Sequence, residues 1–430
     1  MSRLHNTLRR LAAAAPAVLA LPLSAQTIFI DDATVHTLLQ PGPMESADIL
    51  IVDGVISAVD YGLEIPPDAQ LIEAEGRPVT PGLFAGISSI GLEEVGLEAS
   101  TVDDKLMFEE KPVADKLRPE FNVALAFNPD STVVPITRIE GYSWTLLGAQ
   151  RAGSIIGGQG RPAMLGGSYT SLIGDPVLFF DVGADAVDQS GGSRAAQWML
   201  LSQALDEAGS AIEWTPYPLL TPAGRKALEL FSGEASTAVT VFHVHRASDI
   251  LQALAFAAEH ELKPVISGAS EAWKVADQLA RAGVPVLLDP LINLPYDFDQ
   301  IGARLDAAAL LHEAGVTIGF INAGEATHNA RALRYGAGVA VAHGLPWDAA
   351  LAALTINPAR MFGVDHHTGT IEAHQRANIV IWSGDPLEAT SAADQVIING
   401  RLDPMVSRQT LLRDRYFAPE GELPRAYHKQ

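Results

Sequence analysis

Short apolar runs alternate with amphipathic stretches through the carboxyl half of the chain. The apolar runs predict strands and the amphipathic stretches predict helices. In chain order we expect a strand over 239–245, a helix over 247–261, a strand over 264–267, a helix over 270–282, a strand over 284–289, a helix over 301–314 and a strand over 316–322. This alternation is typical of parallel βα units and predicts a TIM-like (β/α)8 barrel over residues 81–364.

Both flanks of that region have a different pattern. Residues 27–72 read as short strands and turns, with a hairpin expected at Val52-Asp53-Gly54-Val55-Ile56, and residues 369–401 have the same character. We therefore expect a small sheet domain formed by both chain ends, from residues 26–80 and 365–404. The charged, proline-containing segment 405–430 reads as a peripheral tail.

The first 25 residues have the pattern of a secretory signal. Arg3, Arg9 and Arg10 precede an apolar stretch too short to cross a bilayer, and small residues end at Ala25. A transmembrane anchor is the poorer interpretation, because prolines interrupt the apolar run. We expect cleavage before Gln26 and a periplasmic protein, by either the general or the twin-arginine route.

Composition narrows the classes of partner. The chain has 51 acidic and 29 basic residues, a formal net charge of -22, and no cysteine. Such acidity predicts no binding to nucleic acid and no membrane insertion after signal removal. A fold without disulfides must depend on its hydrophobic core, which a chain of this length can build.

One short motif carries candidate chemistry. His243-Val244-His245 is the only His-x-His in the chain. Side chains two apart on a strand share a face, so both imidazoles can converge on one metal ion. A catalytic zinc site needs three protein ligands, so this pair requires partners from elsewhere.

Several further motifs indicate a family. They are Pro-Gly-Leu-Phe-Ala-Gly at 81–86, Thr-Ile-Asn-Pro-Ala-Arg at 355–360, Thr-Gly-Thr-Ile-Glu at 368–372, Arg-Ala-Asn-Ile-Val-Ile-Trp at 376–382, Gly-Asp-Pro at 384–386 and Asn-Gly-Arg at 399–401. In this order they resemble the amidohydrolase superfamily, most closely its exported, imidazolonepropionase-like members. The resemblance extends from about Gln26 to Arg401 and its combined specificity is high.

The resemblance implies that the sheet domain is a composite β-sandwich beside the TIM-like barrel. It also implies hydrolysis of carbon–nitrogen bonds by a water bound to one or two divalent metals, usually zinc. Family members take ligands from a His-x-His after strand 1, a histidine each after strands 5 and 6, and an aspartate after strand 8. Here the strand-1 motif matches Ile87-Ser88-Ser89, the strand-6 histidine matches Gly268 and the strand-8 aspartate matches Asn322. Only His243 keeps a ligand, and no lysine or glutamate stands at strand 4.

Some residues remain as candidates for the pocket. His243 is a possible metal ligand or proton-transfer group, whereas His245 more simply bonds to a neighbouring loop. Glu325 or His328 could replace the charge missing at Asn322, although His328 also reads as a polar residue at a helix start. Gln159, in a glycine-rich stretch over 153–160, reads as part of a loop after strand 2. The acidic residues between 93 and 104 read as a solvated loop.

Two functions are consistent with these residues. One is a periplasmic hydrolase of carbon–nitrogen bonds, non-peptide or dipeptide-like, with an altered or single-metal site at His243. The other is a non-catalytic relative that binds a small or peptide-like ligand, or that pairs with an active amidohydrolase as a homo- or hetero-oligomer.

Overall fold

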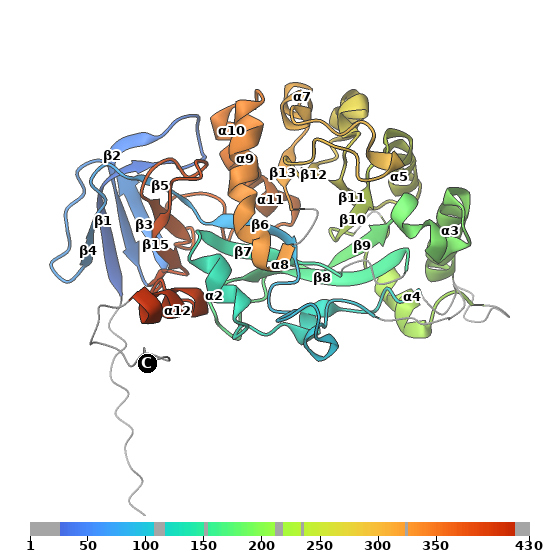
Figure 1. Cartoon of the computed structure of the whole chain (residues 1–430), viewed down its shortest axis with the longest axis horizontal. Coiled ribbons are helices and arrows are strands. Elements are labelled where there is room, and N and C mark those ends of the chain that lie inside the picture. The colour runs from blue at the N-terminus through green and yellow to red at the C-terminus, as the bar shows by residue number, and fades with distance from the viewer. Residues whose placement is uncertain are drawn as a thin grey trace, which may run out of the picture.

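The computed structural model describes residues 26–106, 117–149, 154–210, 218–233, 236–322 and 326–417. The predicted signal segment and residues 418–430 lie outside this part of the chain. Two large sheets organise the described residues, one at the left of Figure 1 and the other through its centre and right.

The first sheet combines both ends of the described chain. Its order is β16-β15-β14-β5-β1-β2-β3, with β4 paired to β1. The strands are β1 (Thr27–Val35), β2 (Met44–Val52), β3 (Val55–Asp60), β4 (Gln70–Glu73), β5 (Pro78–Pro81), β14 (Ile379–Trp382), β15 (Ala393–Ile398) and β16 (Arg401–Leu402). The antiparallel pairing of β5 with β14 joins the two ends, as the sequence predicted.

Local sequence explains the two tight turns of this sheet. Asp53 and Gly54, between β2 and β3, have φ of 53° and 81°, and Asn399 and Gly400, between β15 and β16, have φ of 51° and 72°. Two successive left-handed residues make the turn that suits the twist of a hairpin, and Asp-Gly and Asn-Gly favour it. The hairpin expected at residues 52–56 is confirmed.

This sheet has an apolar core of its own. Alternate residues of β1 and β2 pack into one apolar cluster with residues of β14 and β15: Ile28, Ile30, Ile49, Ile51, Ile379, Ile381 and Ile397 belong to it. A separate core is consistent with a separate domain.

The second sheet is the barrel sheet. Among the described residues it contains eight strands in chain order, from β6 to β13. They are β6 (Leu83–Ser88), β7 (Tyr142–Leu147), β8 (Ile156–Met164), β9 (Val177–Asp181), β10 (Val239–Val244), β11 (Lys263–Gly268), β12 (Val286–Leu288) and β13 (Ile318–Phe320).

The sheet is nearly closed between β13 and β6. A Cβ added to Gly86 would lie 3.6 Å from the Cα of Ile321, so the two strands approach closely at one level. Elsewhere along this seam the Asn357 amide donates to the Ile318 carbonyl at 2.9 Å, and the Leu354 carbonyl accepts from the Phe84 amide at 2.7 Å.

One strand contradicts a regular (β/α)8 barrel. β8 runs antiparallel to both β7 and β9, whereas the other neighbouring pairs are parallel. Only eight residues connect β7 to β8. A parallel crossover needs a dozen residues or more, so the chain returns in the opposite direction. The expectation of a loop over 153–160 is therefore wrong from Ile156 onward, where β8 begins.

Helices surround the barrel sheet (Figure 1). They are α2 (Val133–Arg138), α3 (Arg194–Gly209), α4 (Pro222–Glu229), α5 (Ala247–Glu259), α6 (Ala276–Ala282), α7 (Ala307–Glu313), α8 (Ala326–Asn329), α9 (Leu333–Ala342), α10 (Trp347–Ala353), α11 (Ile356–Met361) and α12 (Arg408–Phe417). Short 3-10 helices are η1 (Ala99–Thr101), η2 (Val123–Ala126), η3 (Ala184–Ser190), η4 (Ala272–Val275), η5 (Phe298–Gln300) and η6 (Ala330–Ala332).

The predicted βα alternation from residue 239 is confirmed, with shorter elements. The helix expected over 270–282 begins as η4, and the one expected over 301–314 is reduced to α7. The Glu271 side chain, just before η4, accepts hydrogen bonds from the amides of Ala247 and Gly302 and so joins the loops after β10 and β12.

A buried arginine connects the barrel helices to the first sheet. Arg334, in α9, is 1% exposed and stacks between Tyr335 and Trp382. Its guanidinium donates to three main-chain carbonyls in the loop after β14: Pro386, Glu388 and Ser391. Within the described part of the chain, no helix is long and apolar enough to cross a membrane.

Candidate functional site

The carboxyl ends of three neighbouring parallel strands carry a row of polar residues. His243 of β10 pairs in register with Asp181 of β9 on one side and with Ser267 of β11 on the other. Paired residues on adjacent strands point to the same side of a sheet. The three side chains therefore share one face at the same level.

Aromatic packing shows which face this is. Phe180 and Phe242, the residues before Asp181 and His243, stack with ring centroids 4.8 Å apart, and both lie against Phe256 of α5. Since α5 covers the outside of the sheet, these phenylalanines point outward. Successive strand residues alternate, so Asp181 and His243 point into the barrel.

His245 follows β10 and turns back over the same site. It is 6% exposed, and its Nδ1 lies 2.8 Å from the Ser270 hydroxyl. Its ring is perpendicular to that of His243, with centroids 5.0 Å apart. The shared face expected for the two histidines is confirmed, and His245 does bond to a neighbouring loop.

Gly268 explains why these imidazoles lie so close together. A Cβ at Gly268 would lie 2.8 Å from His245 Cε1, 3.0 Å from His245 Nε2 and 3.1 Å from His243 Cε1. Its φ is +85°, a conformation that disfavours any residue with a side chain. The two rings thus occupy the space into which a histidine side chain at position 268 would project.

The serine hydroxyls at the end of β6 form hydrogen bonds with neighbouring residues. Ser89 is buried and donates to Asp104 Oδ2 at 2.8 Å, while the hydroxyls of Ser88 and Thr145 lie 2.7 Å apart. Asp104 is only 4% exposed, so the interpretation of residues 93–104 as a solvated loop is wrong at this position. Ser89 holds the loop after β6 in place.

The end of β13 supplies an amide. Asn322 Nδ2 donates to the Asn329 carbonyl in α8 at 3.4 Å. Glu325 lies outside the described residues, and His328 is in α8 with a side chain that the structure does not describe. The helix-start interpretation of His328 agrees with the backbone, and the proposed replacement of the missing charge stays untested.

Gln159 is a structural residue of β8. It is 7% exposed, and its Nε2 donates to the Pro119 carbonyl at 2.8 Å. The prediction that it belongs to a loop after strand 2 is wrong, because the antiparallel return places it within the sheet.

Sequence reasoning missed Asp181. It ends β9, the fourth strand of the barrel sheet, and is 8% exposed. A signal was present, because Val177-Leu178-Phe179-Phe180 is an apolar run ending in a carboxylate. That pattern matches a buried strand whose last residue reaches the site.

An ion-pair network ties together the loops that follow three strands. Arg194, at the start of α3, pairs with Asp249 of α5 at 3.1 Å and with Asp299 of η5 at 2.5 Å. Burial raises the pKa of Asp249 despite Arg246 and Arg194 nearby. For Asp299 burial acts in the same direction, but hydrogen bonds from Arg194 and the Ala184 amide outweigh it and lower the pKa.

The described residues do not fit the family's metal. Among them, no group of three or more histidine, aspartate or glutamate side chains is placed to hold an ion. His243 and Asp181 contribute one imidazole and one carboxylate. At Gly268, where family members have a further histidine, the rings of His243 and His245 leave no space for a side chain. The imidazole of His243 and the carboxylate of Asp181 can instead exchange hydrogen bonds with a small polar molecule.

Comparisons with known proteins agree with the fold. Residues 227–403 match the sequence model of the amidohydrolase family. The amidohydrolase tasK of Hapsidospora irregularis is 25% identical over 434 residues, which cover 88% of this chain and 42% of that protein. This chain therefore spans less than half the length of that relative.

Solved structures share the architecture. An amidohydrolase from Thermotoga maritima MSB8 has a TM-score of 0.76 and 23% identity, over 87% of this chain and 99% of that one. A prolidase complexed with N-methylphosphonate-L-proline has a TM-score of 0.53 and 15% identity, over 89% and 100%. These likenesses show a shared fold, and the family model matches residues 227–403, which is less than half of the chain.

Proposed function

We propose that this protein is an exported, imidazolonepropionase-like member of the amidohydrolase superfamily that binds a small amide or peptide-like ligand without metal-dependent hydrolysis. One observation carries the proposal: the rings of His243 and His245 fill the space beside Gly268. The signal-like pattern of residues 1–25 supports a periplasmic location, where the site would meet small solutes from outside the cell.

The chemistry of the remaining groups supports binding. Asp181 and Ser267, together with His243, present an acceptor, a hydroxyl and an imidazole at one level of the barrel. An amide ligand has one donor and one acceptor, which such a set can satisfy. At position 322 an asparagine cannot act as the base that an aspartate provides, because it has no ionisable carboxylate.

Metal analysis tests the absence of a metal centre. The mature protein, purified and incubated with zinc, manganese and iron, is desalted and analysed beside His243→Ala and the matched surface variant His312→Ala. We expect far less than one metal per chain in all three. A full equivalent in wild type and His312→Ala that disappears in His243→Ala would refute the proposal.

Ligand binding is tested with N-methylphosphonate-L-proline and a set of dipeptides, by calorimetry on the mature protein. We expect saturable binding that Asp181→Asn weakens, with the dipeptides recovered unchanged. Binding unaffected by Asp181→Asn would place the ligand elsewhere, and release of free amino acids would show that the protein is a hydrolase.

A second candidate is a hydrolase with an altered centre, favoured by the register pairing of Asp181 with His243. A carboxylate beside an imidazole can orient that ring and stabilise its protonated form during proton transfer. If this candidate holds, dipeptide or cyclic-amide turnover is abolished in both Asp181→Asn and His243→Ala and retained in His312→Ala.

We also propose that the protein associates with a further amidohydrolase, as a homo- or hetero-oligomer. The support is that most of the family's ligand positions are substituted here, at Ile87, Gly268 and Asn322, while the folding motifs remain. Co-purification from the native host tests this, and a monomer with no partner would contradict it.

A further inference from the structure

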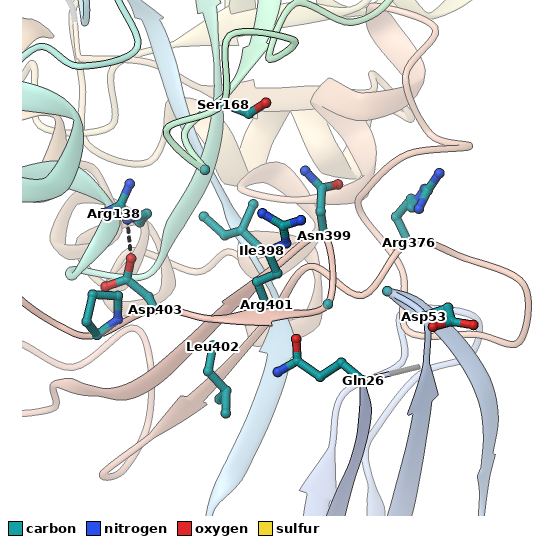
Figure 2. A pocket seen from close by; sticks show the side chains of 14 residues that line it. Gln26, Asp53, Arg138, Ser168, Arg376, Ile398, Asn399, Arg401, Leu402 and Asp403 are labelled. Carbon is teal, nitrogen blue, oxygen red and sulfur yellow. Dashed lines mark ion pairs between the residues drawn. The ribbon is translucent and has the colours of Figure 1, made fainter. Parts of the chain in front are cut away.

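A pocket of about 750 Å³ lies between the turns of the first sheet and the segment that follows β8 (Figure 2). It is distinct from the carboxyl ends of the barrel strands, so nothing argued about His243 bears on it. Three arginines line it: Arg138, Arg376 and Arg401. In a chain of net charge -22, three guanidinium groups around one pocket are unexpected.

The three arginines have different surroundings. Arg138 of α2 forms an ion pair with Asp403, shown as a dashed line in Figure 2, and donates to the Leu165 carbonyl at 3.0 Å. Both side chains of this pair are largely buried, at 14% and 6% exposed. Arg138 is therefore committed to structure and its charge is compensated.

The charges of Arg376 and Arg401 are not balanced by an ion pair of this kind. Neither forms an ion pair or a side-chain hydrogen bond with any residue in the described part of the chain, and both are exposed. Apart from Asp403, the acidic residue in the lining is Asp53, which the described contacts do not join to either arginine. These two cations are thus available to a ligand.

Main-chain hydrogen bonds join the two segments that carry these arginines. The Gly400 amide, next to Arg401, donates to the carbonyl of Ala377, next to Arg376, at 2.9 Å. The Ala377 amide in turn donates to the Gly54 carbonyl at 3.0 Å. Two segments separated by more than twenty residues therefore present their arginines from one hydrogen-bonded unit.

The floor of the pocket is closely packed. A Cβ at Gly400 would lie 2.1 Å from the Gly54 Cα, so the two turns touch through main-chain atoms. The Asn399 amide donates to Asn378 Oδ1 at 2.8 Å, and the Asn399 side chain lines the pocket near Arg401 in Figure 2. Such a floor costs little reorganisation when a ligand binds.

We propose that this pocket binds a small ligand through an oxyanion group, which is a carboxylate or a phosphate. Arg376 and Arg401 hold this group, and the side-chain amide of Asn399 lies in the same pocket. A guanidinium presents paired donors whose fork matches two oxygens of such a group. Because both arginine side chains are exposed, a ligand can reach them directly from solvent.

Calorimetric titration of the mature protein with inorganic phosphate, and separately with succinate, tests the proposal at constant ionic strength. The test variant is Arg376→Gln/Arg401→Gln. The control, Lys226→Gln/Arg281→Gln, removes two positive charges from exposed positions on α4 and α6. We expect one site per chain and an affinity at least about tenfold weaker in the test variant, with the control within about twofold of wild type.

Comparison of the two ligands identifies which group the pocket prefers. If the double variant does not fold, as judged by its melting curve, the single variants Arg376→Gln and Arg401→Gln provide the same comparison. The proposal is overturned if wild type binds neither anion, or if the test and control variants weaken binding equally.

Discussion

Substitution of Gly268 by alanine tests the packing at the barrel site most directly. The added Cβ would meet both imidazoles at 2.8–3.1 Å, and the residue would have to keep a φ of +85°. Left-handed strain costs roughly 1–2 kcal/mol for a residue with a side chain. Overpacking adds about 1–3 kcal/mol, and lower entropy of the unfolded chain returns about 0.4–1 kcal/mol. We expect a net loss of about 1–4.6 kcal/mol.

A matched control separates strain from contact. Gly283 has a φ of +64°, and a Cβ there would have nothing within 4 Å. Gly283→Ala should therefore show strain alone, at most about 1.5 kcal/mol. The difference between the two variants, about 1–3 kcal/mol, is the contribution of the imidazole rings.

The assay is equilibrium urea unfolding followed by tryptophan fluorescence, with the m-value used to check that both variants unfold as wild type does. His245→Ala in the Gly268→Ala background should recover part of the loss, because it removes the nearest atoms. Equal destabilisation by Gly268→Ala and Gly283→Ala would refute the argument that the rings fill this space.

Three further predictions concern other parts of the molecule. Arg334→Met should cost at least about 3 kcal/mol in thermal unfolding, because three carbonyls lose their donor; a loss no larger than that of the surface variant Arg281→Met would contradict this. Gly400→Ala should cost roughly 3 kcal/mol or more of unfolding free energy and so lower the melting temperature, because main-chain atoms of Gly54 block its Cβ; an unchanged melting curve would show that the two turns are not in contact. Asp299, whose pKa is lowered in the folded state from the usual 3.8, stabilises the fold above that value and loses this effect as the pH falls through the folded pKa. Asp299→Asn should thus be less stable than wild type at neutral pH and should lose less stability on acidification below about pH 4, measured as urea midpoints; parallel pH profiles would contradict this.

Much of the fold was predictable from local pattern. The strands and helices between residues 239 and 322 follow from apolar periodicity, and the turns at Asp53-Gly54 and Asn399-Gly400 follow from their residue types. Both signals are local, so they do not depend on the rest of the chain. The joining of both chain ends in one sheet was predicted from their shared character.

The direction of β8 was not predicted. An apolar, glycine-rich strand has the same composition whichever way it runs, and Gln159 looked like a loop residue for that reason. The decisive quantity was the length of the connection from β7, which depends on where both strands begin and end. Strand boundaries are the least reliable part of any sequence interpretation.

The candidate site shows the same division. The sequence by itself determined that Gly268 and Asn322 carry no metal-ligating charge, because this is a property of residue type; His245 lies beyond the end of β10, so strand period alone does not fix where it points. Only the tertiary structure placed Asp181 beside His243, turned His245 onto Ser270 and filled the space at Gly268 with two rings. These contacts join strands far apart in the chain, and their geometry depends on register and backbone conformation, which no local pattern encodes.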